Sequence, residues 1–107
     1  MFGDIGKMMQ LAGRLKKELP AMKEKLAEAQ YTAEAGGGAV AATVNGRLQI
    51  SDLSVDPALM AEADAEMLAD LVKAAVAAAQ ARATEAASEA MKELTGGMTL
   101  PGMDDLI

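Results

Sequence analysis

The chain has 107 residues, a net charge of −6, one Phe, one Tyr and no Trp, Cys or His. That length suits a single small domain, whose core must be built from Ala, Leu, Met and Val. The absence of Cys and His excludes disulfides, thiolate or imidazole zinc sites and imidazole acid–base catalysis. No stretch approaches a signal peptide or a membrane span, so we expect a cytoplasmic protein with no membrane partner.

The charge is divided unevenly along the chain. Residues 1–30 contain six basic and four acidic residues, a net charge of +2, whereas residues 31–107 contain four basic and twelve acidic residues, a net charge of −8. If the protein binds an anion, the first thirty residues are therefore the expected contact.

Residues 1–30 are expected to form an amphipathic helix. Apolar residues recur at steps of three and four, which places them on one stripe of a helix: Met8, Leu11, Leu15, Leu19, Met22 and Leu26. Pro20 falls on the outer face of that helix, away from the stripe. It is expected to kink the helix without ending it.

Residues 31–56 are expected to form a three-stranded antiparallel meander. Val40, Ala42 and Val44 alternate with smaller or polar residues, as in a half-buried strand. Gly-rich residues 36–38 and the Asn45-Gly46 pair predict the two turns. The apolar pattern changes parity after the second turn, which predicts a β-bulge near residues 51–52.

Residues 58–95 are expected to form a second long helix, with residues 96–107 as a loose tail. Its apolar pattern is continuous from about Asp64 to Leu94. Thirty helical residues extend about 45 Å, but a six-residue strand covers only about 20 Å. Roughly half of the stripe should therefore overhang the sheet, which predicts a symmetric dimer.

Most candidate sites have a structural explanation. Residues 36–38 lack the Lys and the following helix of a phosphate loop, so a turn is favoured. The methionines Met8, Met22, Met67 and Met91 fall on core stripes. An acidic group near the start of the second helix suits the helix dipole better than a calcium site. It consists of Glu62, Asp64, Glu66 and Asp70.

The basic residues of the first helix are the strongest functional signal. Lys and Arg along one helix can follow a phosphate backbone without reading bases. A solvated face with ordinary ion pairs explains the same pattern on composition alone. A helix lying on a membrane surface fits less well, because the polar face mixes both signs of charge.

Several strings in this order resemble the YbaB/EbfC family of bacterial nucleoid-associated proteins over nearly the whole chain. They are "MFGDIGKMMQLAGRLKKEL", "GGGAVAATVNG", "VDPALM" before "EMLADLVKAAVAAA", and "MKELTGGMTLPGM". The resemblance implies an α+β fold of order α-β-β-β-α and a tweezer-like homodimer with projecting helices. It further implies double-stranded DNA as partner, a nucleoid location, and neither catalytic activity nor a cofactor.

The resemblance attributes DNA contacts to the projecting helices, and matching basic residues lie on both helices of this chain. They are Lys7, Arg14, Lys16, Lys17, Lys23 and Lys25 on the first helix and Arg82 and Lys92 on the second. We therefore expect a dimeric, non-enzymatic protein that contacts DNA phosphates with low sequence specificity and influences chromosome organisation and gene expression. The alternative is a protein-interaction module whose acidic helix pair grips a basic partner in DNA repair or replication.

Overall fold

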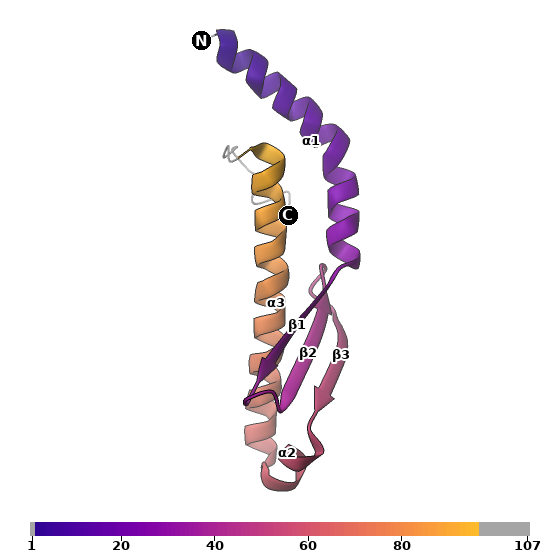
Figure 1. Ribbon diagram of the computed structural model, residues 1–107, viewed down its shortest axis with the longest axis vertical. Helices are drawn as coiled ribbons and strands as arrows, with labels where there is room; N and C mark the ends of the chain where they lie inside the picture. The colour runs from indigo at the N-terminus through magenta and orange to yellow at the C-terminus, as the bar shows by residue number, and fades with distance from the viewer. Residues whose placement is uncertain (1, 97–107) are drawn as a thin grey trace.

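The computed structural model describes residues 2–96 as an elongated molecule of 67 × 22 × 18 Å (Figure 1). Its elements are α1 (Phe2–Glu28), β1 (Gln30–Ala35), β2 (Val40–Asn45), β3 (Ile50–Val55), α2 (Pro57–Glu62) and α3 (Ala65–Thr95). The expected α+β class, with a three-stranded meander between two long helices, is confirmed. Residues 97–107, where the sequence predicts a loose tail, lie outside the described residues.

The three strands pair in the order β1-β2-β3, and both pairs are antiparallel. The register shifts between β2 and β3, because Thr43 lies opposite Asp52 while Val44 lies opposite Ile50. Ser51 is left as an extra residue in β3, and its hydroxyl donates to the Thr43 carbonyl at 3.3 Å. The bulge predicted near residues 51–52 is therefore confirmed.

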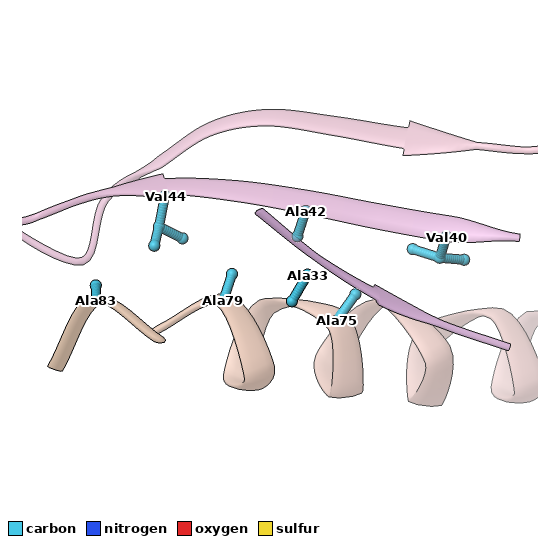
Figure 2. Packing of buried hydrophobic residues seen from close by; sticks show 7 residues of the cluster. All are labelled: Ala33, Val40, Ala42, Val44, Ala75, Ala79 and Ala83. Atoms are coloured by element: carbon cyan, nitrogen blue, oxygen red, sulfur yellow. The ribbon is translucent and has the colours of Figure 1, made fainter. Parts of the chain in front are cut away.

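One face of the sheet packs on the first half of α3. Figure 2 shows the side chains of β2 pointing toward three alanines of the helix. The buried cluster comprises Ala33, Val40, Ala42, Val44, Ala75, Ala79 and Ala83. Because the buried residues of the helix are alanines here, its backbone can lie close to the sheet, while Leu71, Val72 and Val76 pack half-buried around this centre.

Helix α3 contacts β1 and β2, and β3 is the strand farthest from it in both views (Figures 1 and 2). Ile50 and Leu53 lie opposite Val44 and Ala42, so they belong to the helix-facing side of the sheet. They are nevertheless 55% and 43% exposed. The uncovered apolar surface of the sheet therefore lies on β3.

The segment 58–95, expected as one helix, is divided into α2 and α3. Ala63 and Asp64 between them have extended backbones, with ψ of 141° and 172°. The Asp64 carboxylate accepts from the Met67 N–H at 2.8 Å and starts a new helix there. The segment therefore forms two helices and not one, because Asp64 caps the start of α3. It also gives this member of the acidic group a structural role.

Helix α1 packs on the C-terminal part of α3 to form an arm that extends beyond the sheet (Figure 1). Leu11 and Leu15 of α1 bury Met91 and Leu94 of α3, and Leu19 and Met22 add half-buried contacts. The α3 stripe therefore extends beyond the sheet, as the sequence predicts, and α1 covers its C-terminal part.

Helix α1 remains continuous through Pro20 and is bent along its length (Figure 1). A proline removes one backbone hydrogen bond and crowds the preceding turn, so a bend is its ordinary consequence inside a helix.

Two of the four methionines expected in the core are half exposed. Met8 is 52% and Met67 is 51% exposed, whereas Met91 is 1% exposed and Met22 is half buried. The stripe near Met8 continues beyond the last turn of α3, and Met67 lies in the first turn of α3, away from the buried cluster. The periodicity of the sequence identified the apolar stripe of each helix, but it did not show where the element that covers the stripe ends.

The β2–β3 turn differs from the two-residue hairpin that Asn45-Gly46 predicts. Four residues, 46–49, connect the strands, and the positive φ of 66° falls on Leu48. Gly46 instead meets the end of α1: its N–H donates to the Ala27 carbonyl at 3.3 Å, and an added Cβ would lie 1.9 Å from the Leu26 carbonyl oxygen. Glycine is required here for close approach.

Candidate nucleic-acid interface

All eight basic residues expected to contact DNA are exposed: Lys7, Arg14, Lys16, Lys17, Lys23, Lys25, Arg82 and Lys92. Six of them lie on α1, which forms one side of the arm and is exposed along most of its length (Figure 1). Because the apolar stripe of α1 turns toward α3, the charged positions are left on the faces that solvent reaches.

The basic residues of α1 form two rows that flank its apolar stripe. Lys7 and Arg14 lie on one edge, with Lys25 continuing the row, and Lys16 and Lys23 lie on the other. Neighbours seven residues apart are separated by about 10 Å along the helix. Such rows can contact the phosphates of a nucleic-acid backbone.

Three of the eight residues already have partners within the chain. Arg14 Nε lies 2.9 Å from the Glu18 carboxylate, and Lys92 Nζ lies 3.8 Å from that of Glu89. Both pairs are largely exposed, so they contribute at most about 1 kcal/mol and can exchange partners readily. These are the only ion pairs within 4.0 Å among residues 2–96.

Arg82 is held differently. Its guanidinium donates to the Thr32 carbonyl of β1 at 2.8 Å, which ties α3 to the outer strand of the sheet. β1 is an edge strand of the sheet, so this contact gives its backbone a partner outside the sheet. Arg82 therefore stabilises the sheet end as well as carrying charge.

Sequence reasoning missed Arg47. The β2–β3 turn docks on the end of α1, so Arg47 lines the same open cleft of about 480 Å³ as Lys23 and Glu24. The Arg47 N–H donates to the Asn45 side chain at 2.9 Å, so the turn holds its backbone. Only the contact between Gly46 and α1 reveals that residues 23 and 47 share a cleft, because they belong to different elements.

The other helix of the arm carries the opposite charge. Glu85, Glu89 and Glu93 recur at four-residue steps along α3, and all three are exposed. They therefore lie on one side of the helix. The arm thus combines a basic helix with an acidic row, and a polyanion is expected to approach it from the α1 side.

These features define a class: a small α+β protein with a compact sheet end and a charged two-helix arm. The model of the YbaB/EbfC DNA-binding family matches residues 1–98. The chain belongs to this family, as the resemblance in its sequence indicated.

Relatives of known name and structure agree with that assignment. A nucleoid-associated protein of Anaeromyxobacter sp. is 46% identical over 100 residues, which cover 94% of this chain and 97% of that protein. A nucleoid-associated protein of Clostridium acetobutylicum is 36% identical over 101 residues, covering 94% and 90%. The crystal structure of the uncharacterized protein HP0035 from Helicobacter pylori superimposes with a TM-score of 0.62 at 26% identity, covering 76% of this chain and 94% of that one.

No helix within the described range 2–96 combines the length and apolarity needed to cross a membrane.

Proposed function

We propose that this protein is a homodimeric, non-enzymatic nucleoid-associated protein that binds double-stranded DNA through the phosphate backbone. The observation that carries the proposal is the row of exposed lysines and arginine along α1, in a chain of the YbaB/EbfC DNA-binding family. Lys and Arg that contact phosphates hold a duplex without reading its bases, which supports low sequence specificity. A protein that covers DNA in this way would influence chromosome organisation and gene expression in the cytoplasmic nucleoid.

The proposed contacts are the basic residues of α1, with Arg82 and Lys92 as weaker contributors because exposed glutamates lie along the same helix, α3. We add Arg47 to this set, since it is exposed and lines the same cleft as Lys23 at the junction of the arm and the sheet. The acidic row on α3 opposes binding from its own side. Affinity should therefore be modest and should fall steeply with salt.

The proposed homodimer rests on the uncovered side of β3. Ile50 and Leu53 on the edge strand β3 are 55% and 43% exposed, and Leu48 in the turn before it is 42% exposed. Apolar side chains grouped at an exposed edge strand favour pairing with another chain, and a second copy would cover both surfaces at once. The substitution Ile50→Lys should dissociate the dimer, as measured by sedimentation equilibrium, and Thr32→Lys on β1 is the control.

A gel-shift titration with duplex DNA tests the function. At low salt the protein should retard DNA, and each lysine that contacts a phosphate should contribute about −0.9 to the slope of log K against log salt. Lys16→Glu should weaken binding and reduce that slope, whereas Lys73→Glu is a control with the same change in charge on α3. The triple variant at Lys16, Lys17 and Lys23 should show the largest loss.

Absence of retardation at low salt would favour the alternative function, an interaction module for a basic protein partner in DNA repair or replication. The acidic row formed by Glu85, Glu89 and Glu93 is the observation that supports it. Equal effects of Lys16→Glu and Lys73→Glu would also contradict a binding site on α1, because net charge alone would then explain the result.

A further inference from the structure

The first turns of α1 carry three exposed apolar side chains. Ile5, Met8 and Met9 are 55%, 52% and 71% exposed, and we refer to them as the tip surface. Their spacing of three and four residues from Ile5 places them on one side of the helix. Apolar side chains that are grouped on a surface are typical of a site that contacts another molecule.

The tip surface lies where α1 extends past the end of α3. Leu11 and Leu15 pack against Met91 and Leu94 in the last turns of α3, and α1 continues beyond this contact toward its first residue (Figure 1). Among residues 2–96, the arm is therefore two helices wide at Leu15 and one helix wide at the tip surface. A single helix is about 10–12 Å across, and the major groove of B-DNA is about 12 Å wide. The end of α1 fits that groove, whereas the two-helix part of the arm is too wide.

A line of basic residues continues from the tip surface along α1. Met9, Lys16 and Lys23 follow one another at intervals of seven residues, about 10 Å apart along the helix and nearly in line. Arg47 lines the same cleft as Lys23 and extends this line to the sheet end. We refer to it as the Lys16 side of the arm. The acidic residues of α1 lie off this line: Asp4, Glu18, Glu24 and Glu28.

The acidic row of α3 lies toward the other side of the arm. Helix α3 contributes Glu93 to the open cleft of about 420 Å³ that Lys25 lines. To the cleft that Lys23 and Arg47 line, it contributes Ala87. A polyanion therefore meets less repulsion on the Lys16 side, which leads to the tip surface, than on the side of Lys25.

The major groove offers one apolar group to a side chain, the C5-methyl of thymine. The other base atoms at its floor are hydrogen-bond donors and acceptors, which Ile and Met cannot pair with. Lys16 lies one step of about 10 Å behind Met9 along the helix, so its charge is available to the phosphates that border the groove. Apolar and charged groups of the same side thus suit one duplex.

We propose that the tip of α1 enters the major groove of duplex DNA and that Ile5 and Met9 contact thymine methyl groups there. The inference rests on the DNA binding proposed above and adds a modest preference for thymine to it. The occupant is DNA and not a second copy. Two copies meeting at their tips would bring together two helices from segments of net charge +2, whereas phosphates neutralise that charge.

Two duplexes of one A·T-rich sequence test the contact, the first with thymine and the second with uracil at every thymine position. The exchange removes methyl groups and leaves all phosphates in place. In a gel-shift titration at low salt, the protein should bind the thymine duplex about four times more tightly for each methyl group that it buries. The dependence of affinity on salt should be the same for both duplexes.

Met9→Gln should bring the ratio of the two affinities close to one without changing the dependence on salt, because no phosphate contact is lost. Met9 is largely exposed and Gln is a good helix former, so the fold should remain intact. Ile5→Gln should lower the ratio in the same way. Met60→Gln is the matched control: Met60 is 56% exposed on α2 at the sheet end, and this variant should keep the wild-type ratio.

Equal affinity of the unmodified protein for the two duplexes would overturn the inference and leave binding through phosphates in place. An unchanged ratio in both Met9→Gln and Ile5→Gln would also overturn it. A lower mass of Met9→Gln in sedimentation equilibrium would assign the tip surface to contact between copies, against the inference. If neither duplex is retarded at low salt, the proposed function fails as well, which distinguishes the two failures.

Discussion

The sheet end and the arm of this molecule are held together in different ways. At the sheet end, Val40, Val44 and Ala79 are 0% exposed, and the buried residues that the helix contributes are alanines. In the arm, Met91 is 1% exposed, but Leu11 and Leu15 are each 8% exposed. The sheet end is held together by the close approach of α3 to the strands. The arm is held together by long side chains that meet between α1 and α3.

This difference indicates which region tolerates substitutions in its core. A core made from Ala and Val leaves no space for a larger group, so its geometry is narrowly defined. Long unbranched side chains such as Met adapt to small shifts of the two helices. We therefore expect the sheet end to dominate stability, while the arm presents charge. Three substitutions test this comparison, from the largest expected effect to the smallest.

Ala79→Leu should destabilise the protein most. Its methyl group is fully buried between α3 and the sheet, so a larger side chain must push the helix away. The expected loss is about 3 kcal/mol in the free energy of unfolding. Chemical denaturation at fixed protein concentration measures it. Ala78→Leu, one residue away and exposed, is the control and should change stability by less than about 0.5 kcal/mol. Equal effects at both positions would refute the close-approach core.

Gly46→Ala should weaken the contact between the sheet end and the arm. The added Cβ would overlap the Leu26 carbonyl oxygen, which is backbone and cannot turn aside. We expect a loss of about 2 kcal/mol, with faster hydrogen exchange at the end of α1. Gly13→Ala is the matched control, because nothing lies within 4 Å of its Cβ position and Ala favours helix. It should stabilise the protein by up to about 1 kcal/mol. Unchanged stability in Gly46→Ala would show that the turn does not dock on α1.

Asp64→Ala should have the smallest effect. It removes the side-chain acceptor for the Met67 N–H at the start of α3, which lies at the sheet end. The expected loss is about 1 kcal/mol. Thermal unfolding followed by circular dichroism measures it, and Glu66→Ala in the same turn is the control. A loss as large as that of Ala79→Leu would mean that the α2–α3 junction, and not the sheet packing, limits stability.

Periodicity in the sequence was sufficient for the strands and for the parity change at Ser51, because both depend on which neighbours alternate. It was also sufficient for the stripe of α1, which follows from helical spacing. It failed for Met8 and Met67, since a stripe does not show where its covering element ends. Arg47 was missed for a related reason: it shares a cleft with Lys23 only because the β2–β3 turn docks on the end of α1, and the two residues are remote in sequence.

The order of the elements, their class and the sign of charge on each helix were determined by the sequence itself. Those properties depend on residue type and spacing within about ten residues, where backbone geometry is local. Only the tertiary structure decided that α1 covers the C-terminal part of α3, that β3 keeps an uncovered apolar side, and that Gly46 serves contact with a helix. These outcomes depend on distances between elements remote in sequence, which no local pattern encodes.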